Sequence, residues 1–251
     1  MDSSTASQVS VFRSARTWLR RAAHQAGIAA TTRKFLAMMW EFLCESTPGR
    51  LRQRYGDAEY DWDHHVNTTS AAVGWHDRLL AVFHSAYQPT EPAAFHEMME
   101  ALQRRTSIDF REFVFLDVGS GKGRTLLMAS DYPFRRITGV ELLPSLHEIA
   151  KENLRRYRSE LQKCFRVESI CADAENFVLP TEPLLLYLFN PLPEYGLRRL
   201  LANLQRSLQD HPRAAYVIYY NPLLEHALAE APRLGKIVAA PQYSIFGSCE
   251  A

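Results

Sequence analysis

Alternating glycines interrupt an apolar segment at the centre of the chain, directly after an acidic residue. The segment 113–118 is apolar except for Asp117. Three glycines follow it at every second position, namely Gly119, Gly121 and Gly123. A buried strand, a glycine-rich turn and a helix over about 122–130 would form the first unit of a nucleotide-binding α/β fold. Glycine leaves room for a ligand against the backbone, so the pattern predicts a nucleotide site at the end of this strand.

The carboxylate of Asp117 narrows the choice of nucleotide. The NAD fingerprint spaces its glycines as Gly-x-Gly-x-x-Gly, whereas here one residue separates each pair. A carboxylate at the strand end repels a pyrophosphate and attracts an ammonium group. The pattern resembles the first motif of class I S-adenosylmethionine (SAM) methyltransferases. The resemblance implies that Asp117 faces the methionyl amino group of SAM, directly or through water. It also implies that the cofactor is lined by Gly119, Ser120, Gly121 and Gly123.

Two further acids end predicted strands. Glu141 ends the strand 136–141, about twenty residues beyond the glycines, where a ribose-binding acid is expected. A carboxylate can accept hydrogen bonds from both vicinal ribose hydroxyls. Asp173 ends the next predicted strand. The family resemblance implies that Asp173 receives the adenine amino group, with Leu142 and Ala174 beside the cofactor.

The rest of the chain alternates between strands and helices. The predicted strands are 113–118, 136–141, 167–173, 183–189, 214–220, 236–239 and 242–246. The predicted fold class is α/β, with a Rossmann-like seven-stranded, mostly parallel sheet and helices on both faces. By the family resemblance the last strand is antiparallel. The SAM-binding domain is predicted over 86–251, and an N-terminal helical extension with an acidic, lid-like loop over 1–85.

Asn190 follows the fourth predicted strand, where a methyl acceptor would lie. Asn190-Pro191 resembles the Asp/Asn-Pro-Pro-aromatic motif of amino-methylating relatives, whose side-chain amide and backbone carbonyl hold the attacking nitrogen. Leu192 and Pro193 replace the second proline and the aromatic residue, which weakens the case for a planar nucleobase or a glutamine amide. Asn190 is therefore a candidate catalytic and cofactor-contacting residue, and the alternative is a turn that ends a strand.

A Tyr-x-Pro-Thr element, Tyr87 to Thr90, precedes a helix predicted over 91–104. Thr90 can cap this helix, and Pro92 suits its first turn. The element resembles a loop of some seven-strand lysine methyltransferases that passes over the methionine end of the cofactor. The resemblance makes Tyr87 a candidate catalytic residue and Thr90 a candidate cofactor contact. The alternative is a purely structural turn.

The N-terminal extension is basic. Two helices are predicted, from Val11 to about Gly27 and over about 32–44, and residues 1–54 carry a surplus of six positive charges. A basic amphipathic helix can contact an anionic membrane surface or an acidic partner. The alternative is that its apolar face docks on the catalytic domain while its arginines are solvated.

Residues 55–70 are acidic by contrast. Tyr60 and Trp62 are surrounded by Asp57, Glu59, Asp61 and Asp63, and His64 and His65 follow. Such a segment can bind a metal, form a polar lid over the active site, or pair with the basic N-terminal helices. No metal site is predicted, because adjacent histidines without helical spacing converge poorly on one ion.

Composition limits the remaining function classes. The net charge is +1, and the four cysteines lack paired spacing, which argues against a zinc site or a disulfide framework. No membrane span or signal peptide is recognised, so a cytoplasmic location is predicted. The predicted function is SAM-dependent methyl transfer to nitrogen, in a protein lysine or a small-molecule amine. The alternatives are a non-enzymatic SAM-binding module and an oxygen or RNA acceptor. The catalytic domain lacks a lysine-rich face, and no DNA partner is expected.

Overall fold

The computed structural model describes residues 58–69 and 88–248, with a few positions before them: Arg16, Arg20, 30–33 and 35–37. Those earlier positions are helical, and the rest of the two predicted N-terminal helices lies outside the described residues. The chain divides into two compact units. One comprises Met1–Gly56 with Thr69–Tyr87, and the other comprises Asp57–Thr68 with Gln88–Ala251.

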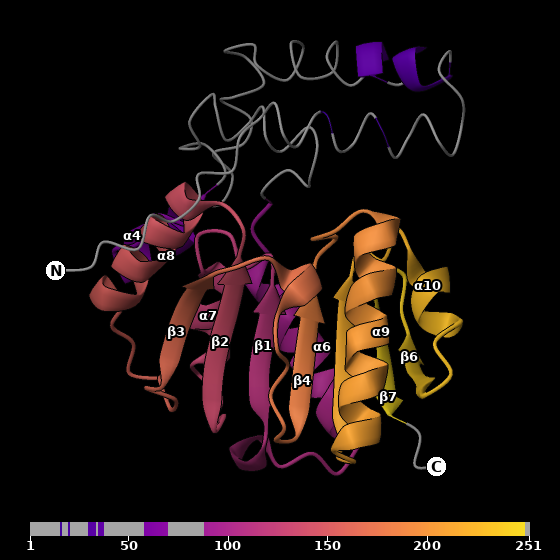
Figure 1. The fold of residues 1–251 in the computed structure, drawn as a ribbon. Helices are drawn as coiled ribbons and strands as arrows, with labels where there is room; N and C mark the ends of the chain where they lie inside the picture. Colours follow the sequence, from indigo (N-terminus) through magenta and orange to yellow (C-terminus); the bar gives the residue numbers. More distant parts are fainter. Residues whose placement is uncertain are drawn as a thin grey trace, which may run out of the picture. The chain divides into compact units, whose positions relative to one another are not determined.

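A seven-stranded sheet forms the second unit, in the order β3-β2-β1-β4-β5-β7-β6 (Figure 1). Its strands are β1 Val114–Val118, β2 Arg136–Glu141, β3 Val167–Cys171, β4 Leu184–Leu188, β5 Ala215–Tyr220, β6 Leu234–Ala239 and β7 Tyr243–Ser248. The first five strands pair in parallel, whereas β7 runs antiparallel to β5 and β6. The predicted fold class and the antiparallel last strand are confirmed.

Helices cover both faces of this sheet. They are α4 Ala58–His64, α6 Pro92–Arg105, α7 Arg124–Ala129, α8 Pro144–Arg156, α9 Glu194–Asp210 and α10 Glu225–Ala229, with the 3-10 turns η3 Phe110–Glu112 and η4 Ala174–Asn176. Figure 1 shows α9 and α10 in front of the sheet and α6 and α7 behind it. Each layer buries its own apolar cluster against the strands between them.

Strand alternation decides which layer each side chain of β1 faces. Leu116 and Val118 belong to the cluster under α9, and Phe115 belongs to the cluster under α6 and α7. Because successive side chains point to opposite faces, Asp117 shares the face of Phe115. The sequence therefore places this carboxylate on the α6–α7 side, at the carboxyl end of a central strand.

The start of α6 differs from the prediction. Glu91 occupies the N-cap position, and no side chain caps the helix. Thr90 does not serve as the cap, because its hydroxyl lies 2.8 Å from the hydroxyl of Tyr187 on β4. The helix faces the sheet with four residues of 0% exposure: Phe95, Met98, Met99 and Leu102.

The acidic segment also belongs elsewhere than expected. We predicted that 1–85 forms one extension, but Asp57–Thr68 clusters with the sheet domain rather than with the residues that flank it. Most of the segment forms the short helix α4, and 65–68 follow it as a turn and an irregular stretch. We call Ala58–Thr68 the strap, and its contacts with the glycine loop are described below.

Candidate cofactor and acceptor site

The glycine loop adopts the left-handed backbone that its composition predicts. The φ angles are 75°, 53° and 85° at Gly119, Gly121 and Gly123. Side chains disfavour this region of φ, so glycine is required at these positions. The backbone N–H groups of Gly119 and Ser120 donate to the Val140 carbonyl, over 2.8 Å and 3.2 Å. These two bonds fix the loop to the end of β2.

Glu141 lies against this loop as a buried carboxylate, with 6% of its surface exposed. One carboxylate oxygen accepts from the Gly121 N–H and the other accepts from the Leu143 N–H, both over 2.8 Å. The two bonds orient the carboxylate, whose oxygens can each accept more than one hydrogen bond. Glu141 therefore has the chemistry to accept the vicinal hydroxyls of a ribose, as predicted from its place at the end of β2.

Asp117 is the second buried carboxyl group beside the loop, with 3% of its surface exposed. Its pKa is raised to about 8, chiefly by burial and then by the nearby charge of Glu141, and a hydrogen bond with Thr125 opposes both effects. An ammonium group placed against Asp117 would offset both unfavourable effects. The donor chemistry of Asp117 and Glu141 thus fits a ligand with a cationic end and a ribose, such as SAM.

Ser120 gives a second observation in favour of a ligand at the loop. Its hydroxyl is buried and has no hydrogen-bond partner within the part of the chain that the structure describes. A Cβ atom added at Gly139 would lie 2.5 Å from this hydroxyl, so the glycine of β2 makes room for it. Gly139 pairs in register with Asp117. Ser120 therefore lies close to the Asp117 carboxyl group, which we expect to contact the cofactor.

The residues after β3 are arranged around the turn η4. The Asp173 carboxylate accepts from the Glu175 N–H and from the Asn176 side-chain amide, each over 2.9 Å. Ala174 is buried, and Leu142, after β2, is half-buried. The structure places these residues at the carboxyl ends of β2 and β3, and their cofactor contacts stay predictions.

Asn190 connects the ends of β4 and β5. Its amide oxygen accepts from the Tyr219 hydroxyl over 2.7 Å, and its amide nitrogen donates to the Asn221 carbonyl over 2.7 Å. Asn190 and Asn221 have φ angles of 45° and 47°, which asparagine tolerates better than most residues. The catalytic role of Asn190 stays a prediction, and its amide already has three internal partners, because the Leu223 N–H also donates to its oxygen over 3.4 Å.

Pro191 places this turn beside the glycine loop. A Cβ atom added at Gly119 would lie 2.7 Å from the Pro191 Cβ, so the two loops are in close contact. The segment after β4 is therefore adjacent to the expected cofactor site, where an acceptor would have to lie. Of the Tyr-x-Pro-Thr element, Thr90 is buried, whereas Tyr87 lies outside the described residues.

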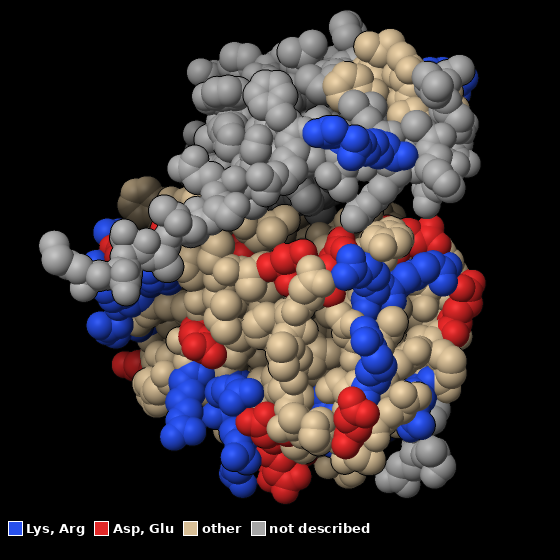
Figure 2. Space-filling model, viewed as in Figure 1, with Lys and Arg blue, Asp and Glu red and all other residues tan. Residues whose placement is uncertain are grey.

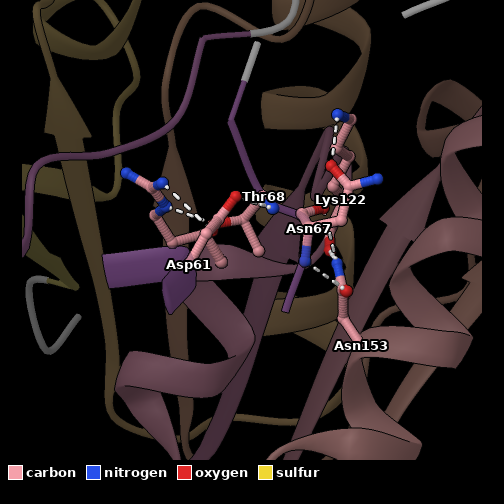
Figure 3. A network of polar contacts seen from close by, with 6 residues as sticks. Asp61, Asn67, Thr68, Lys122 and Asn153 are labelled. Carbon is pink, nitrogen blue, oxygen red and sulfur yellow. Dashed lines mark hydrogen bonds and ion pairs between the residues drawn. The ribbon is translucent and has the colours of Figure 1, made fainter. Parts of the chain in front are cut away.

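Sequence reasoning missed two buried cations of the glycine loop and the segment that they hold. The Lys122 side chain has 0% exposure and donates to the Asn67 amide oxygen over 3.1 Å (Figure 3). Burial lowers its pKa to about 8. Asn153 of α8 accepts from the Asn67 N–H over 2.8 Å and donates to the carbonyls of Asn67 and Lys122, over 2.9 Å and 2.8 Å. Asn153 thus joins the strap to the glycine loop.

Arg124 holds the other side of the strap. Its Nε donates to the Thr68 hydroxyl over 2.6 Å, and its guanidinium lies 3.4 Å from the Asp61 carboxylate and 5.0 Å from the Tyr60 ring centroid. Asp61 accepts from the backbone N–H of Thr68 over 2.7 Å. Asp61 of the strap therefore pairs with Arg124 of the catalytic domain. In the sequence, only the many acids of the strap indicated that it would pair with a basic group. No group of three potential metal ligands is found among the described residues.

Comparisons with known proteins agree with this geometry. Residues 115–211 match the model of a family described as a methyltransferase domain. This segment is a class I methyltransferase domain. The cofactor of this class is SAM, which supplies an electrophilic methyl group on its sulfonium. No curated protein matches the chain.

Several solved structures resemble the methyltransferase at low identity. They include a ribosomal protein L11 methylase from Lactobacillus delbrueckii subsp. bulgaricus (14% identity, TM-score 0.44, 65% of this chain and 80% of that chain). An RNA methyltransferase from Salinibacter ruber, solved with S-adenosyl-L-homocysteine, has 19% identity and TM-score 0.39 over 64% of this chain and 92% of that chain. A SAM-dependent methyltransferase from Aquifex aeolicus has 17% identity and TM-score 0.43 over 64% and 97%. In the described part of the chain, no helix has the length and apolarity of a membrane span.

Proposed function

We propose that this methyltransferase transfers the methyl group of SAM to a nitrogen acceptor, either a protein lysine or a small-molecule amine. The observation that carries the proposal is the charge distribution after β4 and β5, where an acceptor would approach. A lysine or amine arrives as a cation and reacts as the neutral amine. Such an acceptor is therefore favoured by the sheet edge at the carboxyl ends of β4 and β5 if carboxylates occur there and the basic side chains are already paired with acids.

Two arginines near this edge form ion pairs with glutamates. Arg199, in the first turns of α9, lies 3.2 Å from the Glu175 carboxylate. Its neighbour Arg198 pairs with Glu194 and Glu230, each over 2.8 Å. Figure 2 shows red side chains interspersed with blue ones on this face of the domain. This mixture of charges supports a small or peptidic cation, because RNA binding favours a continuous basic surface.

The residues of the chain would divide the work as follows. Glu141 and Asp117 hold the ribose and the amino group of the cofactor, which fixes the position of its methyl group. The side-chain amide or backbone carbonyl of Asn190 accepts a hydrogen bond from the incoming N–H and aligns the nitrogen lone pair with the methyl group. An amide is not a strong base, so the acceptor nitrogen gives up its proton to water. In-line alignment of this kind can account for a large part of the rate.

The remaining expectations for this protein are part of the same proposal. Tyr87 is a candidate catalytic residue through the resemblance of its Tyr-x-Pro-Thr element. The positive surplus of residues 1–54 supports weak contact with an anionic membrane surface or an acidic partner. A cytoplasmic location agrees with this function, since SAM and amine acceptors are both available there.

The test is a transfer experiment with methyl-labelled SAM and a cell lysate. The small molecules of the lysate are first separated from its macromolecules, and the two fractions are then recombined for the reaction. The products are divided into protein, RNA and small-molecule fractions. We expect label in the protein or the small-molecule fraction, carried by nitrogen. The matched control is the Glu141→Ala variant, which should transfer much less label when the SAM concentration is kept low. Label confined to RNA, or to an oxygen ester that alkali cleaves, would contradict the nitrogen acceptor.

A further inference from the structure

We propose that Thr125, Thr90 and Tyr187 form a chain of hydroxyl groups that positions the Asp117 carboxyl group and controls its protonation, so that cofactor binding is coupled to proton release. The inference rests on the proposed contact between Asp117 and the cofactor amino group. It makes the three hydroxyl residues positioning residues, because they act on the cofactor through Asp117.

Strand register places the two ends of this line of polar groups on the same face of the sheet. Asp117 on β1 is paired with Tyr187 on β4, so both side chains point to the α6–α7 face of the sheet. The Tyr187 hydroxyl lies 2.8 Å from the Thr90 hydroxyl, which in turn lies 3.5 Å from the Thr125 hydroxyl. Thr125 is hydrogen-bonded to Asp117. Strands β1 and β4, helix α7 and the segment before α6 therefore supply one continuous line of three hydroxyl groups and a carboxyl group, which we call the hydroxyl line.

The hydroxyl line, which consists of Asp117, Thr125, Thr90 and Tyr187, is enclosed by apolar side chains. None of its four residues has more than 6% of its surface exposed. The Tyr187 ring contacts Phe95 and Phe115, with centroid separations of 5.9 Å and 6.1 Å. Polar groups in such surroundings need internal partners, and here they find them in each other. A buried line of this kind responds as a unit when one end changes its charge.

The charged groups around the line determine which end changes. Asp117 faces Glu141 from β2, and Tyr187 faces Asp117 and Tyr220 from β5. Burial raises the pKa of Tyr187 well above its usual value, so this residue keeps its proton. The carboxyl group of Asp117 is thus the end of the line that ionises in the neutral range.

Hydroxyl groups can reverse their direction of donation. When Asp117 is neutral, its own proton can be donated to Thr125, and the Thr125 hydroxyl can donate to Thr90. When Asp117 is ionised, each hydroxyl can donate toward the carboxylate, beginning with Tyr187. The line therefore stabilises the charged carboxylate that a cofactor ammonium requires. At neutral pH, binding of that ammonium should release the proton of Asp117.

The experiment measures the affinity of the full-length protein for S-adenosylhomocysteine between pH 6 and pH 9 by calorimetry. The wild-type protein is compared with Tyr187→Phe, Thr90→Val and the double variant. The reference ligand is 5′-methylthioadenosine, which lacks the amino acid end of the cofactor. Tyr132→Phe is the matched control, because it removes another hydroxyl of the same apolar cluster, one that contacts His96 and not the line.

We expect the affinity midpoint to lie near pH 8 in the wild type and about one pH unit higher in each single variant. Each variant is then weaker than the wild type by about tenfold at pH 7 and by about twofold at pH 9, and the midpoint of the double variant is no higher than that of Thr90→Val. The ammonium-free ligand should show no midpoint in this pH range with any of these proteins, and Tyr132→Phe should show the wild-type profile for S-adenosylhomocysteine.

A loss of S-adenosylhomocysteine affinity by the same factor at every pH would overturn the inference and leave the proposed function standing, because it would indicate a general structural effect. A shifted midpoint in Tyr132→Phe would overturn it in the same way. A wild-type protein without affinity for S-adenosylhomocysteine at any pH would overturn the cofactor contact of Asp117, and the inference with it.

Discussion

Replacing Asp117 by asparagine should change the pH dependence of stability in a way that the structure specifies. The folded protein holds this carboxyl group with a pKa of about 8, because it is buried next to Glu141. In the unfolded chain an aspartate has a pKa near 3.9. A raised folded-state pKa means that stability is fully present below about pH 4 and is lost as the pH rises toward 8.

The magnitude follows from the size of the shift. Each pKa unit corresponds to 1.36 kcal/mol, so at pH 7 the wild-type domain should lose about 4 kcal/mol relative to acid conditions through this one group. The Asp117→Asn variant has nearly the same shape and cannot ionise. Its stability minus that of the wild type should therefore grow by about 1.4 kcal/mol per pH unit between pH 5 and pH 8, and then level off.

The assay is urea unfolding of the ligand-free protein at pH 5, 6, 7 and 8, with both proteins in the same buffers. Any fixed difference in hydrogen bonding of the asparagine adds a constant offset and leaves the slope unchanged. Titration of Lys122, whose pKa is lowered to about 8, occurs in both proteins and cancels. A stability difference that does not vary with pH would refute the reasoning about this buried carboxyl group.

Three further predictions concern cofactor, acceptor and strap. Glu141→Ala should weaken SAM binding by about 1.5–3 kcal/mol, measured by calorimetry, because it removes hydrogen bonds to a charged group, and an unchanged affinity would contradict the ribose contact. Asn190→Ala should lower turnover about tenfold to a thousandfold with little change in SAM affinity, and wild-type turnover would make it a turn residue. Asn153→Ala should cost about 2–4 kcal/mol in urea unfolding, because it leaves backbone groups of Asn67 and Lys122 without their partner. Asn203→Ala, which loses one bond to the Glu175 carbonyl, should cost about 1 kcal/mol, and equal losses would argue against a special role of Asn153.

The strands and their acids were predictable because local pattern determines them. Buried parallel strands read as apolar runs, and a glycine loop after such a run defines where the carboxyl end lies. Asp117 and Glu141 follow from this rule alone, as does the face of the sheet that Asp117 shares with Phe115. The predicted bounds of β2 coincide with the observed strand, Arg136–Glu141.

The hydroxyl line and the strap were not predictable, because they depend on contacts between distant parts of the chain. Thr90 is 97 positions from its partner Tyr187, and in the sequence it reads as a helix cap. Asn153 lies on the buried face of α8 with Leu146 and Ala150, and only the fold shows that it faces Asn67, 86 positions away. In the sequence Lys122 looks like an exposed loop residue, whereas in the structure the strap covers it. Such contacts require the tertiary arrangement, which periodicity does not provide.

The central claim is that the loop after β1 and the acid after β2 bind SAM. Calorimetry of the purified full-length protein with SAM, S-adenosylhomocysteine and NAD tests it most directly. The account predicts that the first two bind at one site per chain, that Glu141→Ala weakens both, and that NAD does not bind. Binding of NAD without binding of SAM would contradict it.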